Sequence, residues 1–192
     1  MLHERIMRGS TYSKTRRIKS AFFAVTSKGN EEKDIFGSKK DREYFLHYLK
    51  IAAGRYDAAV HAYCLMSNHY QLLLEMPLGN LSQLMDHIKG AYTEYVNVKQ
   101  KRGGSFFQGR YEAIVVEADK YVKEISRQIH LNPVTAGIVK KPEEFTWSSY
   151  NSYVGKELCP GWLTIDFILG YFDKKKSTAQ EKYREFVELM IG

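Results

Sequence analysis

The chain has 192 residues, of which 44% are hydrophobic and 14% aromatic, so it is long enough to bury one core with an appended segment. Its 29 lysine and arginine residues against 22 aspartate and glutamate residues leave a formal charge of +7, which favours an anionic partner such as nucleic acid. No apolar run approaches the ~20 residues that cross a bilayer, and the first ten residues lack the apolar segment of a signal peptide, so we expect a cytoplasmic protein with no membrane partner. Cys64 and Cys159 lack CxxC spacing, which excludes a disulfide framework and a thiolate zinc site.

The chain opens with a strand, a helix and a hairpin. Residues 21–30, AFFAVTSKGN, form a short β-prone run that ends in a Gly-Asn pair. Residues 38–56 carry aromatic and aliphatic side chains at helical spacing, and Ser38 is a candidate N-cap. Two strand-like runs follow at 58–66 and 69–76, and the turn-prone Ser-Asn pair between them predicts a hairpin.

A second helix, a further strand and a third helix complete the pattern. Residues 80–100 place one apolar stripe along a helix, although Gly90 weakens its middle. Residues 105–118, SFFQGRYEAIVVEA, hold the last strand. Residues 119–132 form a helix that we expect to stop at Asn132, because the proline that follows disfavours helical conformation in the residue before it.

The order β-α-β-β-α-β plus one helix predicts an α+β fold of the ferredoxin-like, split βαβ type. We expect a main domain over residues 1–140 and a C-terminal extension over 141–192 that is docked on it. The extension is aromatic and partly helical, with Trp147 and Trp162 covering the edge of the domain. Its closing amphipathic helix should present Met190 on the apolar face.

Polar side chains interrupt the strand at 69–76. Alternation along a strand puts His69 and Gln71 on one face, ~6 to 7 Å apart, where both can reach one ion or form hydrogen bonds beneath a helix. One imidazole with amide oxygens suits Mg²⁺ or Mn²⁺ better than zinc. On the third helix, Tyr121, Gln128 and Asn132 share a face that can pack against this strand, which makes Asn132 either a third neutral ligand or simply a helix-ending residue.

Four segments carry a family resemblance. HAYCLMSNHYQLLLE, NLSQLMDHIKGAYTEYVN, SFFQGRYEAIVVEADKYV and IHLNPVTAGIV followed by WSSY resemble, in that order and at those spacings, the single-tyrosine HUH transposases, and above all their REP-associated subgroup. The similarity spans about residues 18–153. It implies a protein in which a His-hydrophobic-His pair and a polar helix residue bind a divalent cation, while a helix tyrosine attacks a phosphodiester of single-stranded DNA to form a 5′-phosphotyrosine bond.

The resemblance implies site residues that depart from the family twice. The first histidine of the pair falls on His69, Gln71 holds the place of the second, and the helix ligand falls on Asn132 before the Asn-Pro turn. An amide oxygen still ligates Mg²⁺ or Mn²⁺, so we expect a weakened site rather than none. The family pattern Tyr-Ile-x-x-Asn-Pro reads QIHLNP here, which puts Gln128 where the nucleophile belongs. A carboxamide cannot form a stable phosphate ester.

The sequence is consistent with three functions. The chain is a transposase-family protein that binds single-stranded or hairpin DNA with impaired cleavage, an active transposase in which Tyr121 substitutes as nucleophile, or a host-adopted nucleic-acid-binding regulator. Tyr121 lies ~10.5 Å from Gln128 along the helix axis and also suits a packed aromatic. A homodimer is possible, as in related transposases. For DNA binding we single out Arg16, Arg17, Lys19, Lys101, Arg102 and Arg110, which cluster near the presumed cleft.

Overall fold

A computed structural model describes residues 21–30, 33–76 and 80–191. Arg16, Arg17 and Lys19 lie outside these described residues. The elements in chain order are β1 (Ala21–Lys28), α1 (Lys39–Arg55), β2 (Ala59–Leu65), β3 (His69–Met76), α2 (Leu81–Gln100), β4 (Glu112–Val116), α3 (Ala118–Thr135), the 3-10 helix η2 (Pro142–Glu144), α4 (Tyr150–Tyr153), α5 (Asp166–Leu169) and α6 (Lys176–Glu188). Within the described ranges, no helix is long and apolar enough to span a membrane.

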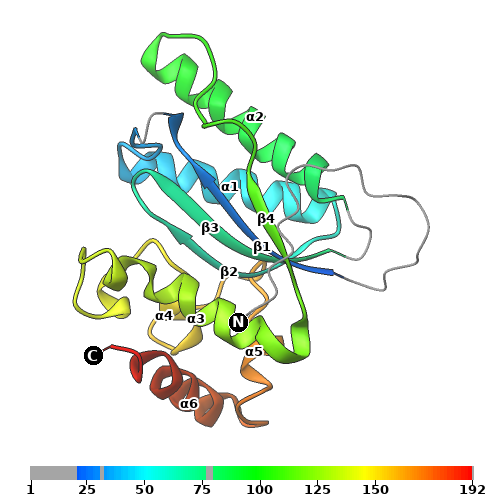
Figure 1. The fold of residues 1–192 in the computed structure, drawn as a ribbon, viewed down its shortest axis with the longest axis vertical. Helices are drawn as coiled ribbons and strands as arrows, with labels where there is room; N and C mark the ends of the chain where they lie inside the picture. The colour runs from blue at the N-terminus through cyan, green and yellow to red at the C-terminus, as the bar shows by residue number, and fades with distance from the viewer. Residues whose placement is uncertain (1–20, 31–32, 77–79, 192) are drawn as a thin grey trace.

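Four strands form one sheet in the order β2-β3-β1-β4, and every neighbouring pair is antiparallel. Each helical crossover therefore joins two parallel strands with a third strand between them, which is the split βαβ arrangement that the sequence predicts. Helices α1 and α2 cover one face of the sheet, and α3 with the C-terminal elements covers the other (Figure 1). The predicted fold class is confirmed.

The side chains of β3 that alternate with His69 and Gln71 make the core under α1 and α2. Tyr70, Leu72 and Leu74 are fully buried, and the Tyr70 ring lies 4.5 Å from that of Phe45 in α1. Burying side chains of this size stabilises the fold by ~1.5 to 3 kcal/mol each. Helix α1 begins where expected, since the Ser38 hydroxyl accepts a hydrogen bond from the third backbone N–H of the helix at 3.3 Å.

Helix α3 runs three residues past the end that its proline predicts. The expectation that it stops at Asn132 is wrong, because Pro133 lies inside the helix and is itself buried. The last turn closes beyond it, where the N–H of Ala136 donates to the carbonyl of Asn132 at 2.9 Å. Gly137 then leaves the helix with a φ of 69°, the left-handed conformation that glycine adopts at little cost. Asn132 is therefore held inside a regular turn rather than at a frayed end.

The C-terminal extension packs along β2. Backbone bridges join Val60 to Leu163 and Cys64 to Ser148, so the outer edge of β2 is paired rather than open. The Trp162 ring stacks on that of Tyr63 at 5.8 Å. The apolar face of α6 ends before Met190, which is 60% exposed beyond the end of the helix and is not part of the packing we predict.

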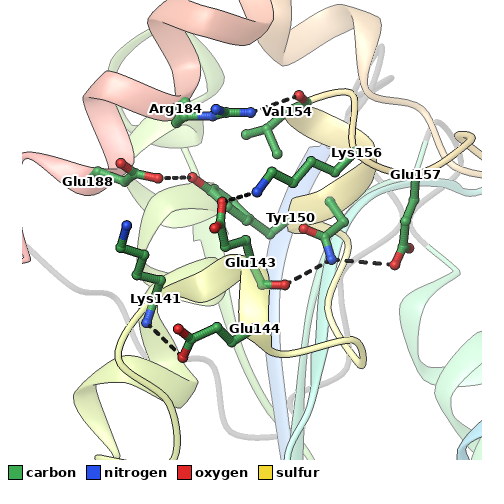
Figure 2. A network of polar contacts seen from close by, with 10 residues as sticks. Lys141, Glu143, Glu144, Tyr150, Val154, Lys156, Glu157, Arg184 and Glu188 are labelled. Carbon is green, nitrogen blue, oxygen red and sulfur yellow. Dashed lines mark hydrogen bonds and ion pairs between the residues drawn. The ribbon is translucent and has the colours of Figure 1, made fainter.

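A polar network joins the parts of the extension to one another. Lys156 pairs with Glu143 at 2.5 Å, and the Tyr150 hydroxyl donates to Glu188 at 3.2 Å (Figure 2). The Arg184 guanidinium in α6 donates to the carbonyl of Val154 at 3.3 Å. These contacts tie η2, α4 and α6 together, so the extension presents one packed unit to the sheet.

Candidate functional site

Three side chains from β3 and α3 meet on the sheet face that α3 covers. The amide nitrogen Nδ2 of Asn132 lies 2.9 Å from Nε2 of His69 and 2.8 Å from Oε1 of Gln71. Alternation along β3 puts His69 and Gln71 on the same face, and the helical turn around Pro133 brings Asn132 over them. The structure therefore brings together all three residues that the sequence singles out as ligands.

The second ring nitrogen of His69 fixes its tautomer. Nδ1 lies 2.8 Å from Oδ1 of Asn68, an acceptor, so Nδ1 carries the proton and Nε2 presents its lone pair toward Asn132. Burial lowers the pKa of His69 from its ordinary value of 6.5, and the charge of Lys28 lowers the pKa further, while the hydrogen bond with Asn132 raises it. The imidazole is accordingly neutral near pH 7 and available as a ligand.

The donor set fits a divalent ion, but weakly. Two acceptors, one nitrogen and one amide oxygen, converge on a single point beside Asn132. Rotating the Asn132 amide would turn its oxygen toward the same point and complete a neutral set that suits Mn²⁺ or Mg²⁺. In the described part of the chain, no group of three or more His, Cys, Asp or Glu side chains could hold a metal. Metal binding by His69, Gln71 and Asn132 stays a prediction.

A groove runs past these residues as two adjoining cavities. One, of about 260 Å³, lies between the sheet and α3 and is lined in part by Gln71 and Gln128. The other, of about 630 Å³, lies on the His69 side. Both are lined by Thr26, Gln71 and Glu112, which the strand register places side by side across β1, β3 and β4.

Three residues that line the groove are not predicted from the sequence. Thr26 and Glu112 line both cavities, and Lys28 is the cross-strand partner of His69 and lines the larger one. Each comes from β1 or β4, and only the pairing register between distant strands brings them to the site. Nothing local to their own segments signals this.

The two candidate nucleophile positions lie in different surroundings. Gln128 is exposed and lines the smaller cavity, one helical turn before Asn132. Tyr121 is half-buried, packs against the hydrophobic core and lines neither cavity. The substitute tyrosine therefore faces a packing environment rather than the groove.

The three described residues that we single out for DNA binding, Lys101, Arg102 and Arg110, lie elsewhere on the domain. Lys101 and Arg102 line a third cavity of about 810 Å³ along α2 and the loop that follows it. The Arg102 guanidinium lies 4.8 Å over the Phe106 ring, and Arg110 is exposed just beyond Gly109, another lining residue. Because α2 covers the sheet face opposite α3, these cations do not line the groove that holds His69, contrary to the expected clustering near the cleft (Figure 1).

Comparisons with known proteins identify a matching family and one solved structure with the same fold. The profile of the family described as IS200-like transposase matches residues 6–132. A solved structure described as a REP-associated tyrosine transposase bound to a REP hairpin superposes with a TM-score of 0.63 at 17% identity, over 82% of this chain and 93% of that chain. A putative transposase from Deinococcus radiodurans R1 gives a TM-score of 0.43 at 15% identity, over 62% of this chain and 91% of that chain. No functionally curated protein matches the sequence.

Proposed function

The chain belongs to the IS200-like transposase family, and on that premise we propose that it binds single-stranded or hairpin DNA without cutting it by the tyrosine route. One observation carries the proposal: the side chain that lines the groove one turn before Asn132 is Gln128, an amide. The likeness to a transposase bound to a REP hairpin supports hairpin DNA as the partner class.

The chemistry of the amide explains the proposed loss of cleavage. A deprotonated phenol attacks phosphorus and expels the 3′-hydroxyl of the cut strand. The phosphotyrosine ester that forms can later be attacked by another 3′-hydroxyl, which displaces the tyrosine. The nitrogen lone pair of a carboxamide is delocalised into its carbonyl, so Gln128 offers no comparable nucleophile. Tyr121 is a poor replacement, because its ring packs against the core.

The other residues of the site could still bind DNA phosphates without the nucleophile. A divalent ion held by His69, Gln71 and Asn132 would supply positive charge for a backbone phosphate. Lys28, exposed at the end of β1 and paired across the sheet with His69, adds a positive charge to the same cavity. On the opposite face, Lys101 and Arg102 offer a second positively charged surface for DNA phosphates. Two such surfaces suit a DNA partner that has a folded stem as well as a single strand.

We also propose different roles for the main domain and for the C-terminal extension. We assign DNA binding to residues 1–140 and a supporting role to residues 141–192, which pair with the edge of β2 through Ser148 and Leu163. A homodimer with shared sites stays a proposal, to be tested by the mass of the protein in solution with and without DNA.

The test is incubation of the purified chain with a panel of hairpin, single-stranded and duplex oligonucleotides, with Mn²⁺ or EDTA. We expect mobility shifts with single-stranded and hairpin DNA, and no covalent adduct on denaturing gels. An RNA competitor of the same sequence should displace the DNA poorly. An adduct that Tyr121→Phe abolishes would establish the substitute nucleophile, and preference for RNA would replace the DNA assignment.

A further inference from the structure

The smaller cavity of the groove is of a size to hold one small ring system. Its volume is about 260 Å³, below the ~300 to 1,000 Å³ typical of pockets for larger organic ligands. Ile114 from β4 and Ile125 from α3 contribute apolar walls, and Ile129 is buried deeper in the helix interface. Apolar walls of this kind receive the faces of a nucleobase when a protein takes a base out of its stack.

Polar side chains complete the lining of this pocket. Glu112 and Gln128 approach from β4 and from α3, and both side chains are exposed. Within the part of the chain that the structure describes, neither side chain makes a hydrogen bond or an ion pair. They therefore keep their full capacity for a ligand: two acceptor oxygens on the carboxylate, and one acceptor and two donors on the amide.

Lys28 decides in which cavity the phosphate of a nucleotide is favoured. Glu112 lines both cavities, and a carboxylate repels a phosphate. Among the described residues that line the smaller cavity there is no cation to offset this charge, whereas Lys28 lines the larger cavity. The phosphate is therefore favoured in the larger cavity and the neutral base in the smaller one. Since the two cavities share Thr26, Gln71 and Glu112, one nucleotide can place its phosphate in the larger cavity and its base in the smaller one.

From this arrangement we propose that the cavity between the sheet and α3 binds one unpaired nucleobase that carries an amino group, with Glu112 accepting from that group and Gln128 completing the contact. The proposal rests on the proposed binding of single-stranded DNA and adds the class of base that the groove selects. Guanine offers two adjacent N–H donors to a carboxylate, and cytosine and adenine offer an amino group, whereas thymine has none. The position of the missing nucleophile thereby becomes a position that reads sequence.

The test uses fluorescence anisotropy with labelled oligothymidine strands that contain one central guanine, cytosine, adenine or thymine, in EDTA. The unmodified chain should bind the guanine strand more tightly than oligothymidine, within the range of about 5- to 150-fold that one bidentate contact to a base provides. Glu112→Gln should remove most of this preference and should raise the affinity for oligothymidine, because it removes a negative charge from the lining of both cavities. Ile125→Trp, which fills the pocket from a partly exposed helix position, should lower the affinity for guanine strands to that for oligothymidine.

Glu181→Gln is the matched control, because Glu181 is an exposed carboxylate on α6 that lines none of the groove. It removes the same charge and should keep the base preference intact. Equal affinity of the unmodified chain for all four strands, or a preference that survives Glu112→Gln, would overturn the pocket and leave DNA binding standing. Absence of any binding to single strands at low salt would overturn the proposed function together with the pocket.

Discussion

Replacing Asn132 by aspartate isolates what holds the candidate metal site together. The change keeps the size of the side chain but removes the amide nitrogen that lies 2.9 Å from His69 and 2.8 Å from Gln71. It also adds a negative charge, which favours a divalent cation. The variant should therefore lose stability when no ion is present and bind Mn²⁺ more tightly than the unmodified chain.

The size of the first effect follows from the two hydrogen bonds. Each contributes ~0.5 to 1.5 kcal/mol to folding, so their joint loss lowers the free energy of unfolding by about 2 kcal/mol. For a chain of 192 residues, ~1 kcal/mol corresponds to ~2 to 4 °C, which puts the expected fall in Tm in EDTA at about 4 to 8 °C. Mn²⁺ at a hundred times its dissociation constant should raise the free energy of unfolding of the variant by ~2.7 kcal/mol.

The assay is thermal unfolding followed by circular dichroism over a series of Mn²⁺ concentrations. The Tm of Asn132→Asp in EDTA should be lower than that of the unmodified chain, and it should rise more steeply with Mn²⁺ concentration. Asn97→Asp is the control, since Asn97 donates to the carbonyl of Gly104 at 3.0 Å, far along α2, and its variant gains the same charge. A rise in Tm with Mn²⁺ that is equal in all three proteins would show that the three groove residues do not act as ligands.

Three further outcomes are expected. Gln128→Tyr, ideally with histidine restored at position 71, should give metal-dependent nicking and a phosphotyrosine adduct on denaturing gels; no adduct in this double variant would refute the idea that only the nucleophile is missing. Neutralising Lys101, Arg102 and Arg110 together should weaken DNA binding and reduce the salt dependence by roughly one unit of slope per lost phosphate contact, and an unchanged slope in salt titrations would reject their role. Burial lowers the pKa of His130 to about 3, below 6.5, so the unfolded chain binds the proton first, and stability should fall by ~1.4 kcal/mol per pH unit from about pH 6.5 toward pH 3. Denaturant unfolding at each pH should show that the free energy of unfolding of His130→Gln depends less on pH than that of the unmodified chain. An identical pH dependence in the two proteins would show that His130 is not the group responsible.

Local patterns predict much of this fold because its elements are locally consistent. Alternation in β3 correctly separates Tyr70, Leu72 and Leu74 from His69 and Gln71. Helical spacing likewise predicts the face of α3 that carries Gln128 and Asn132. These patterns succeed because period and burial agree along a single element.

The errors have nonlocal causes. The preference of the residue before a proline places the end of α3 at Asn132, but burial of Pro133 and the closing bond from Ala136 outweigh that preference. Alternation also says nothing about what covers a face: Glu75 shares the face of His69, yet it binds the buried ring of His61 at 3.1 Å instead of joining the groove. Glu112 shows the same limit, since only the register of β4 on β1 brings it beside Thr26 and so into the groove that Gln71 lines.

The departures at positions 71 and 128 are consistent with one another. A strongly held ion serves a site that must stabilise charge while a phenol attacks phosphorus. If Gln128 replaces the attacking group as we propose, the groove no longer needs to bind an ion tightly, and the neutral side chains of His69, Gln71 and Asn132 would be sufficient to contact a phosphate. The same replacement places an amide, a group that reads bases, at the mouth of an apolar pocket beside Glu112. The proposed loss of cleavage and the proposed base recognition thus both depend on Gln128, and the base preference of Glu112→Gln tests the second independently of the first.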